Sequence, residues 1–163
     1  MRRGILFWGA TLMGLAFLIG GVVMVGMGYH TQGELVQDLR NENLEVADPA
    51  ILLTYEGARA PEGVEVPMVV IDTAMEAHNQ ALVIRTHTLS STEGKTYSQM
   101  GREDPNRDFY LKSLTLQTSL HLAHTGLELT LFVMGTGVAF AGLGAGILLI
   151  GLPIVSKVEE HLF

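Results

Sequence analysis

Two long stretches without a charged side chain constrain this 163-residue sequence more than any other feature. They extend from Ile5 to Met27 and from Leu129 to Ser156. A helix needs about 20 apolar residues to cross the hydrocarbon core of a bilayer, and each stretch reaches that length. The sequence therefore predicts a two-pass membrane protein, and it argues against a soluble enzyme and against a disordered chain.

The expected fold class is a mainly α membrane protein. It consists of a two-helix transmembrane hairpin with a small α+β extracytoplasmic domain, and the second membrane helix extends outward as one long helix. The expected segments are a cytoplasmic N-terminus at 1–4, transmembrane helices at 5–28 and 127–152, the extracytoplasmic domain at 29–126 and a cytoplasmic tail at 153–163.

Charged residues beside the two spans predict the orientation. Arg2 and Arg3 precede the first span and Lys157 follows the second, and short flanks rich in Lys and Arg remain in the cytoplasm. The first stretch is longer than the roughly 7–15 apolar residues of a cleavable signal peptide, so we expect an uncleaved signal anchor. The expected location is a bacterial cytoplasmic membrane, with both ends of the chain on the cytoplasmic side.

The middle of the chain carries the whole net charge of −7. Between Tyr29 and Gly126 there are fourteen acidic and seven basic residues, and an acidic surface repels phosphate backbones. Nucleic acid is therefore not an expected partner. The chain contains no cysteine, which excludes a disulfide framework, a thiolate metal site and a thiol nucleophile.

The residues after the first span predict a helix followed by two strands. Apolar spacing indicates that the membrane helix continues over 31–46 as an amphipathic helix. Asp48-Pro49 should end it, because the residue before a proline avoids the helical region. The β-rich runs 51–55 and 64–71 predict two strands, and Pro67 makes the second an edge strand.

Two further helices are expected in the rest of the middle segment. Asp72 or Thr73 can cap a helix over 74–89, and its expected apolar positions are Met75, Leu82, Ile84 and Leu89. After a loop at 90–103, Asp104 as N-cap and proline at the first helical position predict the start of the long helix. No helix breaker is visible between that start and Pro153.

Glycines in the second span predict close helix packing. Gly142 and Gly146 form a GxxxG pattern, with Ala141 and Ala145 in neighbouring registers. Small residues four positions apart let two backbones approach closely, whether the partner helix belongs to this chain or to another subunit. The alternative is that glycine is simply common in membrane helices. Because two spans cannot bury both glycine-rich surfaces on all sides, we expect other membrane subunits as partners, besides the lipid bilayer.

One helix face carries a tentative metal site. His121, His124 and Glu128 share that face just before the apolar stretch, and imidazole and carboxylate groups bind transition metals. His78 or His87 could supply a fourth ligand. The simpler interpretation is a set of polar residues at the membrane interface, so no metal is expected in the isolated chain; a metal, lipid or pigment shared at a subunit interface stays open.

No catalytic motif is visible. Lys95 follows Gly94 without the GxxxxGK[ST] frame of a phosphate-binding loop, and no serine lies in a GxSxG turn. The dense charge run Arg102–Asp108 is expected to be a solvated helix start with local ion pairs. We therefore expect a protein that is not an enzyme.

Gly94-Lys95-Thr96-Tyr97, then Arg102-Glu103-Asp104-Pro105, then a long helix leading into a glycine-rich span resemble a group of bacterial two-pass membrane proteins. Such proteins, common in actinobacteria, are often labelled aromatic ring-opening dioxygenase small subunit. The resemblance covers roughly residues 35–153. It implies a membrane hairpin with an outside domain and no established activity.

The function expected from these features is that of a non-catalytic accessory subunit in a larger membrane complex, of the energy-transducing or oxidative kind. The alternative is a stand-alone membrane-anchored binding or sensor module, which should show a ligand pocket between the 74–89 helix and the long helix. A metal-binding component of a membrane oxidoreductase is the third hypothesis.

Overall fold

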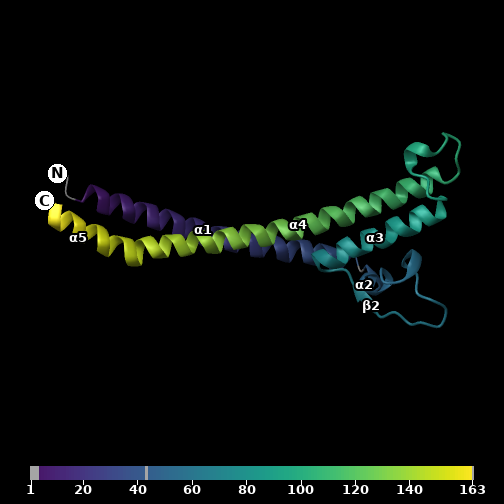
Figure 1. The fold of residues 1–163 in the computed structure, drawn as a ribbon, viewed down its shortest axis with the longest axis horizontal. Coiled ribbons are helices and arrows are strands. Elements are labelled where there is room, and N and C mark those ends of the chain that lie inside the picture. Colours follow the sequence, from purple (N-terminus) through teal and green to yellow (C-terminus); the bar gives the residue numbers. More distant parts are fainter. Residues whose placement is uncertain (1–3, 43, 163) are drawn as a thin grey trace. The chain divides into compact units, whose positions relative to one another are not determined.

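The computed structural model describes residues 4–42 and 44–162, and these residues are mostly helical (Figure 1). The chain forms two compact units. The helix-pair unit combines Met1–Gln32 with Leu129–Phe163, and the central unit is Gly33–Glu128. Arg2 and Arg3, on which the predicted orientation depends, lie outside the described residues.

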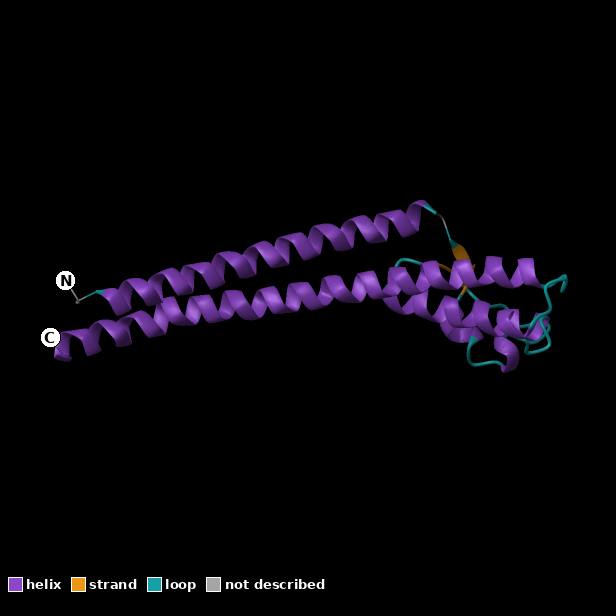
Figure 2. Cartoon of the chain, turned by 90° about the horizontal axis from the view of Figure 1, so that it is seen from above, coloured by secondary structure: helices purple, strands orange, loops and turns teal. Residues whose placement is uncertain are grey.

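Two long helices account for most of the chain. Helix α1 is Ile5–Asn41 and helix α4 is Arg107–Gly146. Within the helix-pair unit they run antiparallel, so the start of α1 and the helix α5 (Leu152–Leu162) lie at the same end (Figure 2). The predicted extension of the first apolar helix beyond residue 30 is confirmed, although α1 ends at Asn41 rather than near residue 46.

Glycines seven residues apart hold these two helices together. Gly14, Gly21 and Gly28 are the buried residues of α1. A Cβ added to Gly137 of α4 would lie 2.7 Å from the Gly21 carbonyl oxygen, and one added to Gly144 would lie 2.6 Å from the Gly14 carbonyl oxygen. Neither side chain would fit, so the two backbones touch directly. We call this contact the glycine seam.

The seam keeps one antiparallel register along both helices. Gly14 faces Gly144, Gly21 faces Gly137, and Gly28 faces Met134 and the Thr130 carbonyl oxygen. Each step of seven residues in α1 matches a step of seven in α4. A repeat of seven keeps one seam in contact when helices wind around each other in a left-handed supercoil.

The long helix continues without a break up to Pro153, as predicted, but it is not α-helical throughout. A π-helical segment, Ile147–Gly151, separates α4 from α5, and the Leu152 N–H bonds to the Ile147 carbonyl. Pro153 has no N–H to donate, and its ring crowds the carbonyl four residues earlier. The wider turn before the proline accommodates this loss.

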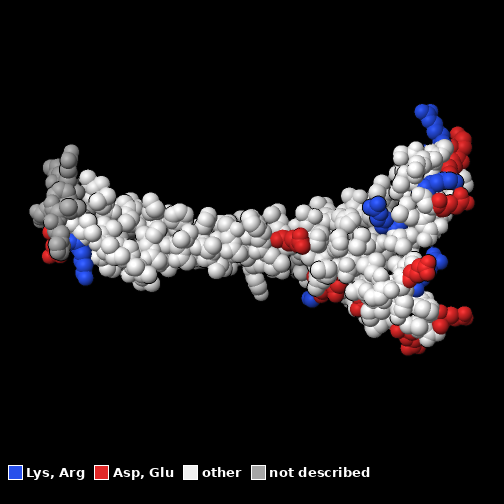
Figure 3. Space-filling model, viewed as in Figure 1, with Lys and Arg blue, Asp and Glu red and all other residues white. Residues whose placement is uncertain are grey.

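The outer surface of the helix pair is apolar. Leu12, Ile19, Phe132 and Leu149 are among its exposed large side chains, and the face in Figure 3 carries almost no Lys, Arg, Asp or Glu along these helices. Both long helices are long and apolar enough to cross a membrane. Only 11% and 6% of the residues in their most apolar windows are buried, unlike the core helices of soluble proteins.

The central unit contains the single sheet of the described residues. Strand β1, Glu45–Ala47, pairs antiparallel with β2, Met68–Val70, so that Val46 faces Val69. Of the second predicted strand, 64–71, only the part directly after Pro67 forms a strand.

The first predicted strand, at 51–55, is wrong. Pro49–Leu52 forms the short helix α2 instead. The Asp48 side chain accepts hydrogen bonds from the Ala50 and Ile51 N–H groups, at 2.9 and 3.4 Å. An aspartate cap followed by proline at the first helical position starts a helix, and this local signal overrides the β propensity of the residues that follow.

Helix α3, Ala74–Ser91, matches the predicted helix. Thr73 is the cap, and its side chain and Glu76 form a reciprocal capping box. The expected apolar face is wrong at Met75, whose side chain is 65% exposed. The buried face instead presents the small side chains of Ala77 and Ala81, which pack with Ile71 and with Leu120 of α4 in the hydrophobic core.

The start of α4 is fixed by a turn and a stacked arginine. Asp104 caps the turn by accepting from the Asn106 N–H at 2.9 Å, and regular helix begins at Arg107, slightly later than predicted. The Arg107 guanidinium lies 3.9 Å from the centre of the Tyr97 ring and donates to the Met100 carbonyl at 2.9 Å. These contacts hold the preceding loop, which includes the 3₁₀ turn Tyr97–Gln99.

We predict that Gly21→Leu separates α1 from α4, because a side chain at this position collides with the backbone of the partner helix. Overpacking of this kind costs about 1–3 kcal/mol or more. Thermal unfolding of the purified chain should therefore shift to lower temperature. Gly20→Leu is the matched control, since a Cβ there meets no other part of the described chain within 4 Å. Equal stability of the two variants would contradict the seam.

Candidate functional site

Three histidines from two helices meet in the central unit. His78 belongs to α3, and His121 and His124 belong to α4. The centre of the His78 ring lies 4.9 Å from that of His124 and 5.8 Å from that of His121. The small residues Ala77 and Ala81 allow this approach, because they let α3 lie close against α4. His78 thus reaches the predicted pair, as one of the two candidates for a fourth ligand.

Hydrogen bonding fixes the tautomer of His124. Its Nδ1 lies 3.0 Å from the Ala74 carbonyl oxygen, and a carbonyl only accepts, so Nδ1 carries the proton. The Nε2 atom is 3.6 Å from Glu128 Oε2. In the neutral ring this Nε2 has no proton to donate, so the Glu128 carboxylate attracts His124 only when the ring is protonated.

His87 does not join the cluster, which corrects its expected role as a possible ligand. Its Nε2 lies 2.9 Å from the Ala58 carbonyl oxygen, and it donates a hydrogen bond there. Among the described residues, no group of three or more His, Asp or Glu side chains is placed to hold a metal ion. His121, His124 and Glu128 share a helix face as predicted, but Glu128 is largely exposed.

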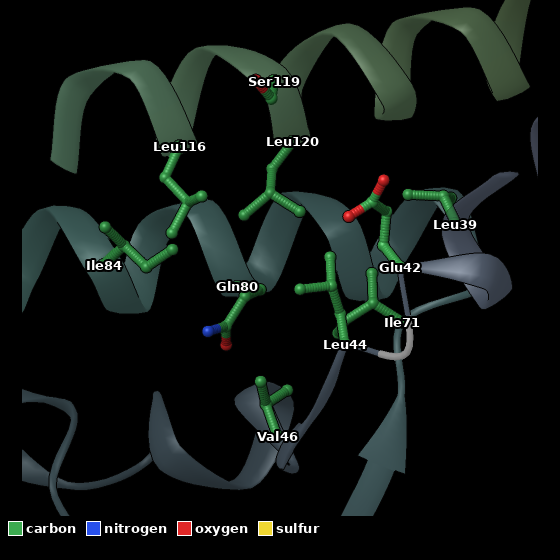
Figure 4. A pocket seen from close by; sticks show the side chains of 10 residues that line it. All are labelled: Leu39, Glu42, Leu44, Val46, Ile71, Gln80, Ile84, Leu116, Ser119 and Leu120. Carbon is green, nitrogen blue, oxygen red and sulfur yellow. The ribbon is translucent and has the colours of Figure 1, made fainter. Parts of the chain in front are cut away.

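A cavity of about 410 Å³ lies between α3, α4 and the first strand of the central unit (Figure 4). Its walls are mainly apolar, with Leu116 and Leu120 from α4 and Ile84 from α3. Three polar side chains, Glu42, Gln80 and Ser119, also line it. A pocket between these two helices is the feature that the binding-module hypothesis requires.

One polar atom of this cavity is unusual. The Gln80 Oε1 atom is buried and has no hydrogen-bond partner within the described part of the chain. His78 Nδ1, two residues earlier along the described α3, shares this property. A buried acceptor without a partner lowers the stability of the fold by about 1–3 kcal/mol. Such atoms are therefore rare unless a ligand or a water molecule donates a hydrogen bond to them.

The sequence signals for Gln80 and Ser119 were weak. Both residues look like ordinary surface residues of amphipathic helices, and only the placement of α3 against α4 makes them line one cavity. The glycine seam, by contrast, is visible in the sequence. Gly14, Gly21 and Gly28 repeat every seven residues, which is the period of packed helix pairs, whereas the GxxxG pattern predicts packing at Gly142 and Gly146.

The predicted packing residues divide between two environments. Ala141 lies in the glycine seam, where its backbone meets Gly21. Side chains added at Gly142 and Gly146 would meet no other part of the described chain within 4 Å. The two glycines therefore do not pack against α1, and the hypotheses that remain are packing against another chain and the absence of any packing role.

Other charged groups form isolated surface contacts. Arg40 and Asp72 are joined by an ion pair of 2.6 Å, which connects the end of α1 to the start of α3. The exposed Lys95 side chain bonds to Glu93 at 2.9 Å, and this hydrogen bond raises the pKa of Lys95. Neither pair includes a histidine of the cluster.

Comparisons with family models, with curated proteins and with solved structures find no match to this chain.

We predict that His121→Ala/His124→Ala leaves the metal content of the purified protein unchanged. A protein site needs at least three ligands with oriented partners, and His124 Nδ1 is already committed to the Ala74 carbonyl. Elemental analysis of the native chain and the double variant, purified side by side without chelators, measures the metal content. Loss of near-stoichiometric copper, iron or zinc in the double variant would instead favour the oxidoreductase hypothesis.

Proposed function

We propose that this chain is a non-catalytic, membrane-integral accessory subunit that docks onto other membrane proteins through an outer face of α4. The observation that carries the proposal is the position of Gly142 and Gly146. Both face away from α1, and both leave the backbone of α4 open to a neighbour. The resemblance to the bacterial two-pass group is compatible with this function.

Membrane insertion is part of the proposal. The low burial of both apolar windows supports it, because water would not tolerate so much exposed apolar surface. In a bilayer the same side chains contact lipid, and the backbone groups are satisfied within the helices. The antiparallel helix pair then places both ends of the chain on one side.

A shallow groove on α4 supports the docking face. It is lined by Ala139, Gly142, Leu143 and Gly146, together with Ile150 of the π-helical segment. Small residues form its floor and larger apolar side chains form its edges. Such a surface accepts a neighbouring membrane helix at short distance, because van der Waals packing and not hydrophobic burial drives association within lipid.

The helix pair itself does not need this face. Its own contact uses Gly137 and Gly144, which occupy a different side of α4. Each glycine weakens helix propensity. What distinguishes Gly142 and Gly146 from the other outward glycines is that both line this groove, and this supports the approach of a partner helix there.

The second candidate is a membrane-anchored binding module. The cavity between α3 and α4 favours it, and the two functions are compatible, since an accessory subunit can also bind a small ligand.

The proposed orientation predicts the reactivity of two engineered cysteines. Ser91 and Ser156 are both exposed, and the chain has no native cysteine. In intact spheroplasts Ser91→Cys should react with an impermeant maleimide, whereas Ser156→Cys should react only after lysis. The opposite pattern would reverse the orientation, and labelling of both in intact cells would contradict two membrane spans.

We predict that Gly142→Leu/Gly146→Leu abolishes co-purification of partner membrane proteins in mild detergent. The added side chains fill the groove, while the glycine seam is untouched, so the thermal stability of the isolated chain should not change. Gly20→Leu/Gly26→Leu is the control, because a Cβ at either of these α1 glycines meets no other part of the described chain within 4 Å. Quantitative mass spectrometry of the purified material measures the partners.

Two results would contradict the docking face. If the double variant retains every partner at the level of the native chain, the α4 groove contacts only lipid. If the control variant loses the same partners to the same degree, the effect belongs to bulk on any apolar helix surface and not to this groove.

A further inference from the structure

We propose that the cavity between α3 and α4 binds an uncharged amphiphilic alcohol, with an alkyl body against the apolar walls and a hydroxyl group at Gln80. The proposal concerns the central unit alone and does not depend on the accessory-subunit function.

The walls and size of the cavity fit the alkyl body. Leu44, Val46 and Ile71 line one side of the cavity, opposite Leu116 and Leu120 of α4 (Figure 4). Its volume of about 410 Å³ lies within the range of about 300–1,000 Å³ that small-molecule sites occupy. Apolar lining with a small number of polar groups is the usual character of such sites.

Gln80 supplies the polar contact. Its Oε1 atom is buried, and nothing in residues 4–42 or 44–162 donates a hydrogen bond to it. A side-chain amide can present either oxygen or nitrogen at that position. A hydroxyl group both donates and accepts, so it satisfies the buried atom in either orientation. Ser119 of α4 also lines the cavity; its hydroxyl donates to the Thr115 carbonyl at 3.1 Å, so its oxygen can accept a hydrogen bond from a ligand.

The charges at the rim exclude an anion. Glu42 lines the cavity, and Asp38 lines the open groove that adjoins it at Leu39, Glu42 and Ser119. Among the described residues that line the cavity and the groove there is no Lys, Arg or His. A carboxylate or phosphate head would therefore meet negative charge without a counterion.

A cation is disfavoured for a different reason. Glu42 is exposed to solvent, so water and salt weaken its attraction for a positive head. An ammonium group moved inward to Gln80 would lose its hydration and gain only a neutral amide. Of the three head groups, the neutral hydroxyl loses the least hydration free energy on entering the cavity.

The test uses three photoreactive probes with one alkyl chain. Diazirine-bearing decanol, decanoic acid and decylamine differ only in the head group. Each is added in increasing concentration to the full-length chain in detergent micelles, irradiated, and mapped by peptide mass spectrometry. We expect saturable labelling by the alcohol on the α3 and α4 peptides that contain Ile84 and Leu116, competed by unlabelled decanol. The half-saturating concentration of the acid probe should be at least about threefold higher than that of the alcohol probe.

Variants separate the polar contact from general adsorption. Gln80→Leu keeps the size of the side chain and removes the hydrogen bond, so the half-saturating concentration of the alcohol should rise about fivefold. Gln37→Leu is the matched control, because Gln37 is exposed and its alcohol labelling should not change. Glu42→Gln should bring the acid probe closer to the alcohol without weakening the alcohol.

A cavity-filling variant provides a second test in case Gln80→Leu does not fold. Leu116 is 51% exposed at the rim, so Leu116→Trp can be accommodated and should block labelling while Gln80 is intact. Three results would overturn the proposal: labelling that spreads evenly over α1 and α4, equal labelling by all three heads, or tighter binding of the amine that Glu42→Gln abolishes. The last would assign the cavity to a cation.

Discussion

Direct contact between the α1 and α4 backbones is the constraint on which the helix pair depends. Glycine is the only residue that permits it, since any Cβ at Gly21 or Gly137 would collide with the opposite backbone. This close approach brings atoms of the two backbones into van der Waals contact along the whole seam. The repeat of seven fixes the register of the antiparallel pair.

Small residues have the same effect in the central unit, with a different consequence. Ala77 and Ala81 draw α3 close to Leu120 of α4, and this approach brings His78 to the two histidines of α4. Beside this contact, Gln80 and Ile84 of α3 line a cavity together with residues of α4 and the first strand. Close packing beside an open space, with Gln80 at the boundary, gives the central unit its candidate binding site.

Local rules predicted the elements whose signals lie within a few residues. The uncharged stretches give the two long helices, because helix length and apolarity depend on each segment alone. Thr73 begins α3 because its side chain and Glu76 satisfy the first free N–H groups. The strand expected at 51–55 failed for a local reason as well, since the Asp48 cap and Pro49 are stronger signals than β propensity.

The tertiary structure alone decided which faces meet. Sequence spacing placed Gly142 and Gly146 on one face of α4, but it could not say that α1 packs on the other, because that choice depends on complementarity between segments more than a hundred residues apart. The same holds for His78, which reaches His124 only through the packing of α3. The sequence by itself determined two apolar helices and an acidic middle segment. The helix contacts, the histidine cluster and the cavity arise from which surfaces fit together, and no local pattern contains that information.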